Sequence, residues 1–112
     1  MKSPITTHVL DTSAGRPAAG VAARLEKWLG SEFREIGRGQ TNEDGRIMDL
    51  VGEPVDAGKY RLTFDTGAYF EARGLSTFFP EVAILFEITN PQQHHHVPLL
   101  LSPFGYSTYR GS

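Results

Sequence analysis

The sequence predicts an all-β domain, a sandwich or barrel of short strands with one brief helix. Segments in which apolar and polar residues alternate recur at a spacing of about 8–12 residues, and turn residues such as Gly, Pro, Asn and Asp separate them. A chain of 112 residues has the usual length of one domain, and no internal repeat or long linker divides it. We therefore expect a single domain over residues 1–112.

Eight strands and one helix account for the pattern. In chain order, the strands are predicted over residues 5–10, 21–26, 32–39, 47–51, 60–65, 82–88, 97–101 and 106–110, and the helix over 66–73.

The first four strands follow from composition and period. β-branched residues favour the first strand, in which Thr6 and His8 share one face. The second has an apolar residue at every odd position; its composition also allows a helix, but the strict period of two favours a strand. The third is largely polar. The Asp44-Gly45 pair is typical of a hairpin turn, and Arg46 stands where the fourth strand begins.

The second half of the chain gives the clearer signals. The fifth strand alternates apolar and polar residues throughout. The helix has a cap residue at Asp65 or Thr66 and is closed by Gly74. The sixth strand is nearly all apolar, so we expect it to be buried on both faces. The last two strands enclose the turn at residues 102–105.

The chain ends on an unusual stretch. Residues 105–112 alternate aromatic and polar residues up to the last serine, which is typical of a strand rather than a frayed end. Ser112 also places a hydroxyl beside the chain's own carboxylate. The alternative is a last strand with a disordered tip, in which Arg110 is a solvated charge.

Composition excludes several classes of function. Thirteen acidic and eleven basic residues give a net charge of −2, and aromatic residues are not interleaved with a basic patch, so we expect no nucleic acid and no membrane as partners. No apolar run approaches the ~18 residues of a membrane span. The absence of cysteine excludes disulfides and a cysteine nucleophile. The start of the chain has no apolar signal segment, so we expect a cytoplasmic protein, or a periplasmic one if a leader was removed.

Three of the four histidines are adjacent. In an extended strand His94 and His96 point to one side and His95 to the other. Two imidazoles on one face can act in acid–base catalysis, or can bind a metal with a third ligand such as His8. The alternatives are a solvent-exposed strand end for the pair and a hydrogen-bonded interior position for His8. Taken alone, Arg46 indicates only a positively charged residue at a strand edge.

A resemblance runs through five segments of the chain, namely His8–Asp11, Gly15–Ala18, Thr41–Arg46, Val97–Pro103 and Tyr109–Ser112. In this order they resemble the 5-hydroxyisourate hydrolases, the transthyretin-related enzymes of urate breakdown. The terminal Tyr-Arg-Gly-Ser is the most specific segment, because it separates the hydrolases from transthyretin, the hormone carrier with the same fold. His95 departs from the family, which usually has tyrosine there.

The resemblance implies a fold, an assembly and a reaction. The fold is a transthyretin-like (prealbumin-like) sandwich of two four-stranded sheets with one short α-helix. The assembly is a homotetramer, a dimer of dimers, with active sites in the channel between the dimers. The reaction is the hydrolysis of 5-hydroxyisourate to 2-oxo-4-hydroxy-4-carboxy-5-ureidoimidazoline, without a cofactor. The alternative function is a non-catalytic transthyretin-like carrier of a small aromatic ligand.

The resemblance also implies the site residues. His8, Arg46, His96 and Ser112 are the expected catalytic residues, and His8, Arg46 and Tyr109 are expected to contact the substrate. The histidines would transfer a proton, Arg46 would stabilise the developing oxyanion, and Ser112 would orient the water or an imidazole.

Two further residues have minor expected roles. Arg110 is expected only to place the terminus. No metal is required, and zinc held by His8, His94 and His96 would be adventitious.

Overall fold

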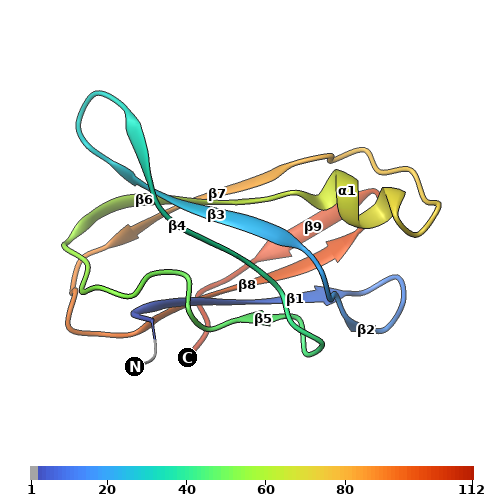
Figure 1. Ribbon diagram of the computed structural model, residues 1–112, viewed down its shortest axis with the longest axis horizontal. Coiled ribbons are helices and arrows are strands. Elements are labelled where there is room, and N and C mark those ends of the chain that lie inside the picture. Colours follow the sequence, from blue (N-terminus) through green and yellow to red (C-terminus); the bar gives the residue numbers. More distant parts are fainter. Residues whose placement is uncertain (1–2) are drawn as a thin grey trace.

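The structure, a computed structural model that describes residues 3–112, consists of two β-sheets packed face to face (Figure 1). One sheet contains, in spatial order, β2 (Arg16–Pro17), β1 (Ile5–Asp11), β8 (His95–Ser102) and β9 (Gly105–Thr108), with β5 (Arg46–Ile47) also paired to β1. The other contains, in order, β4 (Phe33–Gln40), β3 (Ala22–Trp28), β6 (Gly58–Phe64) and β7 (Val82–Ile88). The helix α1 (Thr66–Glu71) lies between β6 and β7 in the chain.

The five-stranded sheet is only four strands wide, because two of its strands are short and lie end to end beside β1. β8 runs parallel to β1 and pairs with one edge of β1 along the whole length of β1. The two-residue strands β2 and β5 therefore share the other edge, β2 opposite Leu10–Asp11 and β5 opposite Thr7–His8. The expected sandwich with one short helix is confirmed, with β2 as an additional short strand.

The inner faces of the two sheets form the hydrophobic core. Tyr60, Leu62 and Phe64 of β6 are fully buried, as are Ile5 and Val9 of β1. This is the alternation that the sequence predicts, because residues two apart in a strand lie on the same face. Each buried side chain of this size contributes about 1.5–3 kcal/mol relative to an exposed one.

β5 is shorter than the predicted fourth strand, since it ends at Ile47. Beyond this point the chain leaves β1, and the amide of Ser3 donates to the Met48 carbonyl at 3.1 Å. The chain then crosses β4 at Gly37, where a Cβ would lie only 1.8 Å from the carbonyl oxygen of Leu50. The crossing depends on this glycine and ends the pairing with β1.

β7 is an edge strand, and only one of its faces is buried. Val82, Ile84 and Ile88 face the core, whereas Leu85 is 62% exposed. The expectation that this strand is buried on both faces is wrong. An apolar run cannot distinguish the inner from the outer face when the outward residues, such as Ala83, are apolar too.

α1 begins and ends close to the predicted positions. The carboxylate of Asp65 caps the helix by accepting a hydrogen bond from the Ala68 amide at 3.1 Å. Beyond the last turn Gly74 has φ +71°, and the Leu75 amide donates to the Phe70 carbonyl at 3.0 Å. Among residues 3–112, no helix is long and apolar enough to cross a membrane.

The C-terminal strand ends two residues earlier than predicted and then pairs with β8 again. β9 pairs with β8 up to Thr108, opposite Leu99. The next residue of β8 is Pro98, which has no N–H to donate to the ladder. Three residues further along, Gly111 forms a bridge with His96 in the same register, and its amide donates to the His96 carbonyl at 2.8 Å. The tail is therefore attached to the sheet, but it is not one continuous strand.

Candidate functional site

His8 and Arg46 lie side by side on the outer face of the five-stranded sheet. β5 runs antiparallel to β1 with Arg46 directly opposite His8, so the two side chains share a face. The turn before β5 is closed by Asn42, whose side-chain oxygen accepts a hydrogen bond from the Arg46 amide at 3.0 Å. Gly45 has φ +76°, and a Cβ there would lie 2.4 Å from the Val9 carbonyl oxygen. The Asp-Gly turn thus positions Arg46 next to β1, opposite His8.

The surroundings of His8 favour the neutral imidazole. Burial lowers the pKa of His8, and the positive charge of Arg46 lowers it further, against an opposing contribution from Asp44. A neutral histidine can accept a proton from water near neutral pH. His8 is half-buried rather than interior, and it lies opposite the positive charge of Arg46.

His94 and His96 converge on one buried hydroxyl. The Oγ1 atom of Thr6 lies 2.9 Å from Nε2 of His94 and 2.8 Å from Nδ1 of His96. The two rings are nearly parallel, with centroids 6.3 Å apart. His95 is only 5% exposed and points into the protein. The prediction that His94 and His96 share one face, with His95 on the other, is confirmed.

His8 and His96 come from neighbouring strands and share a face. In the parallel pairing of β1 with β8, Thr6 lies opposite His96 and His8 lies opposite Pro98. Side chains two apart in a strand point the same way, so both histidines project from the outer face. His8, Arg46 and His96, the residues that the resemblance implies, therefore project from the same face of one sheet.

The C-terminal tail borders His96. A cavity of about 290 Å³ is lined by His96, by Tyr109 and Arg110 of the tail and by residues 84–87 of β7. The guanidinium of Arg110 donates to the side-chain oxygen of Gln93 at 3.0 Å, which ties the tail to the segment before β8. This contact gives Arg110 a means of placing the terminus. Ser112 is exposed and directly follows the bridge residue Gly111.

Gly111 packs against the His96 ring. A Cβ at this position would lie 2.6 Å from Cδ2 of His96 and 3.2 Å from Cγ of Pro98. No real side chain fits at such a distance without moving the imidazole. Only glycine, which has no Cβ, fits at this position of the terminal tetrapeptide while the His96 ring stays in place.

The described histidines are not grouped with further metal-binding side chains. Within residues 3–112, no group of three or more His, Asp or Glu side chains is arranged to hold a metal ion. A ring nitrogen of His94 and one of His96 instead contact Thr6. Adventitious zinc at His8, His94 and His96 stays a prediction from the sequence.

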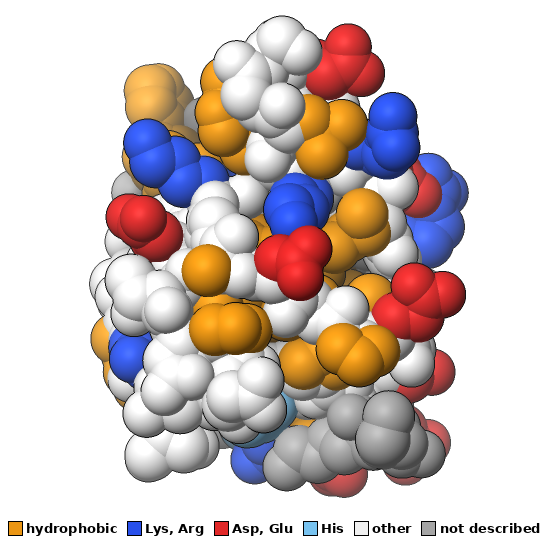
Figure 2. Space-filling model, turned by 90° about the vertical axis from the view of Figure 1, so that its left-hand side faces the viewer, with side chains coloured by type: hydrophobic (Ala, Val, Ile, Leu, Met, Phe, Trp, Pro, Cys, Tyr) orange, Lys and Arg blue, Asp and Glu red, His pale blue; other side chains and the backbone are white. Residues whose placement is uncertain are grey.

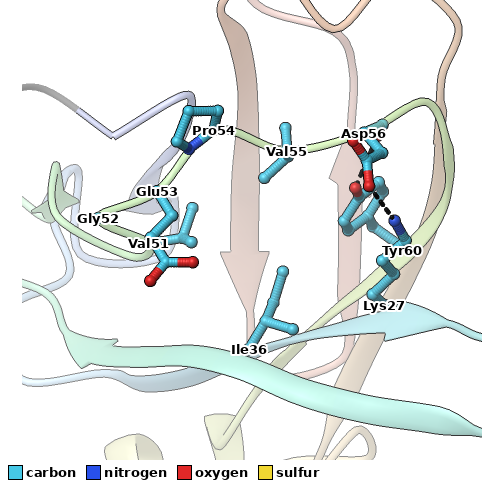
Figure 3. A pocket seen from close by; sticks show the side chains of 9 residues that line it. All are labelled: Lys27, Ile36, Val51, Gly52, Glu53, Pro54, Val55, Asp56 and Tyr60. Atoms are coloured by element: carbon cyan, nitrogen blue, oxygen red, sulfur yellow. Dashed lines mark hydrogen bonds and ion pairs between the residues drawn. The ribbon is translucent and has the colours of Figure 1, made fainter.

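A larger cavity, of about 610 Å³, lies between β4, β6 and the loop over residues 51–56 (Figure 3). Lys27 points toward Asp56, and their Nζ and Oδ2 atoms are 3.3 Å apart. Tyr60 donates its hydroxyl to the Asp56 carbonyl at 2.7 Å. Among the described residues, those lining this cavity include neither histidine nor arginine. Size alone does not make it a reactive site, and Lys27 and Asp56 in its wall already pair with each other.

The end of the sandwich that faces the viewer in Figure 2 has a mixed surface. Hydrophobic, acidic and basic side chains are interspersed there. Nucleic-acid binding proteins instead gather lysine and arginine into a patch or stripe. In this view lysine and arginine do not gather into such a patch.

Sequence reasoning does not single out Thr6, which the structure places at the centre of the histidine pair. The available signal is its position two residues before His8, on the same face of the first strand. Its partners His94 and His96 are 88 and 90 residues away in the chain. Only the pairing of β1 with β8 reveals the contact.

Comparisons with known proteins agree with the geometry. Residues 5–111 match the HIUase/Transthyretin family. A 5-hydroxyisourate hydrolase of Salmonella dublin is 48% identical over 109 residues, which cover 96% of this chain and 80% of the relative. The structure of Klebsiella pneumoniae 5-hydroxyisourate hydrolase superposes with a TM-score of 0.87 at 41% identity, covering 96% of this chain and 97% of that one. Sea bream transthyretin, solved in complex with thyroxine, gives a TM-score of 0.91 at 33% identity, covering 97% and 95%.

Proposed function

Because the chain belongs to the HIUase/Transthyretin family, we propose that it hydrolyses 5-hydroxyisourate to 2-oxo-4-hydroxy-4-carboxy-5-ureidoimidazoline in urate degradation. One observation carries the proposal: His8, Arg46 and His96 share the outer face of one sheet, next to the terminal Tyr-Arg-Gly-Ser. Its hydrolase relatives at this level of identity support the same reaction.

The reaction needs a proton carrier. The oxygen of water bonds to a ring carbonyl carbon, the ring C–N bond breaks, and a proton from water ends on the departing nitrogen. We assign this proton transfer to His96 and His8, whose side chains lie on the same face. An imidazole has a reference pKa of ~6.5, so it can both accept and return a proton near neutral pH.

The reaction also needs a group that stabilises negative charge. The guanidinium of Arg46 stays protonated and offers a planar fork of donors to the oxyanion that forms on the carbonyl oxygen. Arg46 lies directly opposite His8, and this supports the assignment. Tyr109, at the border of the cavity next to His96, is assigned to substrate binding. Ser112 is assigned to orienting the attacking water.

We further propose a homotetramer that forms as a dimer of dimers. β7 and β9 are the outer strands of their sheets, so each has an edge of backbone N–H and C=O groups that can pair with another subunit. Leu85 on β7 is 62% exposed, and Phe104 in the β8–β9 turn is 74% exposed. Apolar side chains at these positions suit burial against other subunits.

The test of the function is the decay of freshly prepared 5-hydroxyisourate, followed by its absorbance. The protein is expected to accelerate the decay over spontaneous hydrolysis. A carrier of a small aromatic ligand would leave the decay rate unchanged while binding the ligand, and that outcome would replace the hydrolase proposal.

Gly111→Ala is expected to lower kcat by ~10–100-fold, because the new methyl group must displace the His96 ring and small misplacements of a reacting group are costly. Steady-state kinetics on 5-hydroxyisourate measures this. Gly52→Ala is the matched control, since a Cβ at Gly52 meets nothing within 4 Å. Equal kcat values for the two variants would show that the close contact has no catalytic consequence.

Deleting Gly111 and Ser112 is expected to reduce turnover by at least ~100-fold while leaving the melting temperature nearly unchanged. Ser112 is exposed and contributes nothing to the core. Thermal unfolding followed by circular dichroism, together with the same kinetic assay, checks both parts. A large fall in melting temperature would assign the tail a structural role.

A further inference from the structure

We propose that Thr6 is a positioning residue that fixes the tautomer and orientation of His96, with His94 as the second partner of its hydroxyl. The kinetic consequence rests on the proposed hydrolase function, whereas the structural consequence does not.

The Thr6 hydroxyl is buried and makes two well-formed hydrogen bonds to the histidines. Both donor–acceptor distances, 2.9 Å to His94 and 2.8 Å to His96, are typical of hydrogen bonds. Thr6 is fully buried although it lies on the outer face of β1. The β-branched side chain has a stiff χ1 angle, so the hydroxyl is held in place.

The proton-accepting role assigned to His96 fixes the direction of each hydrogen bond. A hydroxyl has a single proton to donate but can also accept. For Nε2 of His96 to take a proton from water, the proton of the neutral ring must lie on Nδ1. That N–H then donates to Oγ1 of Thr6, and the Thr6 hydroxyl donates to Nε2 of His94.

This order has a chemical consequence for His96. When its Nε2 accepts the proton of the attacking water, the ring becomes an imidazolium and its Nδ1–H bond to Thr6 strengthens, since charged donors make stronger hydrogen bonds. Thr6 thereby orients the ring and favours its charged form during the reaction. Thr6 thus has the role of the residue that orients the general base, as the third member of a catalytic triad does.

The neighbouring residue provides a matched control. Thr7 is also fully buried on β1, but it faces the core, and its hydroxyl donates to the Val97 carbonyl at 2.6 Å. Thr6→Val and Thr7→Val make the same change in volume and each removes a buried hydroxyl. Only Thr6→Val removes a partner of His96.

The first measurement is the tautomer of His96 without substrate, from the ¹⁵N chemical shifts of its ring nitrogens at about pH 8.5, where free imidazole is neutral. The wild-type protein is expected to show the proton on Nδ1, as is Thr6→Ser, which keeps the hydroxyl. Thr6→Val is expected to lose this preference. A wild-type His96 protonated on Nε2 would overturn the proposal, even if Thr6→Val failed to fold.

The second measurement is the kinetics of 5-hydroxyisourate hydrolysis. Thr6→Val is expected to lower kcat by ~10–100-fold with little change in KM, because orientation of the base matters in the transition state. Thr6→Ser is expected to recover most of the rate, and Thr7→Val to keep kcat near wild type. A wild-type kcat in Thr6→Val, or an equal loss in Thr7→Val, would overturn the positioning role. An inactive wild-type protein with the expected tautomer would instead reject the hydrolase function alone.

Discussion

Replacing His96 with asparagine is expected to lower kcat for 5-hydroxyisourate hydrolysis by at least ~100-fold, the usual contribution of one acid–base group. Asparagine can still hydrogen-bond with Thr6, but it cannot accept and return a proton near neutral pH. The substrate contacts assigned to Arg46 and Tyr109 remain, so we expect KM to change little. Stopped-flow or steady-state kinetics on freshly prepared substrate measures both constants.

The adjacent histidine provides the control for this variant. His95 points into the protein, where burial and then the charge of Arg110 lower its pKa. His95→Tyr restores the residue that the hydrolases usually have, and we expect it to keep a near wild-type rate. If His96→Asn and His95→Tyr had equal rates, His96 would not be the proton carrier.

Replacing Arg46 with alanine is expected to lower kcat/KM by at least ~100-fold, because it removes the donor fork assigned to the oxyanion. The same change is expected to raise the pKa of His8. Burial lowers that pKa first, and the positive charge of Arg46, directly opposite, lowers it further, so removing the charge makes the imidazolium form of His8 easier to reach. An NMR titration of His8 and the kinetic assay check the two effects independently.

Two further variants separate charge from geometry. Arg46→Lys keeps a positive charge beside His8 but loses the planar fork, so we expect a low His8 pKa together with reduced turnover. Arg34→Ala, an exposed position on β4 of the other sheet, is expected to change neither. If Arg46→Ala left both the His8 pKa and the rate unchanged, the assigned role of Arg46 would be wrong.

Period-two patterns predicted most of the strands because they depend only on which residues face the core. The patterns failed where neighbouring segments decide the outcome. The length of β5 depends on Gly37, which lets another segment cross β4, and the end of β9 depends on Pro98 in the partner strand. The outer face of β7 looks buried from the sequence because Ala83 and Leu85 are apolar, although β7 is an edge strand.

Some features of the candidate site also follow from the sequence, whereas others depend on how distant segments pair. A strand model predicts that His94 and His96 share a face, and the Asp-Gly turn predicts a strand that starts at Arg46. Strand alternation does not predict that Thr6 joins the two histidines, because the partners lie 88 and 90 residues away and meet only through the parallel pairing of β1 and β8. The resemblance to the hydrolases implies the site residues, and the structure adds the contacts that Thr6 and Gly111 make with His96.

The most direct test of the proposed site is the decay rate of freshly prepared 5-hydroxyisourate with the wild-type protein and with a His96→Asn/Arg46→Ala double variant. Circular dichroism should first show that both proteins are folded. We predict that the wild-type protein accelerates the decay over spontaneous hydrolysis and that the double variant returns it close to the uncatalysed rate. A wild-type protein that leaves the decay unchanged, or a folded double variant that keeps the acceleration, would contradict the assignment.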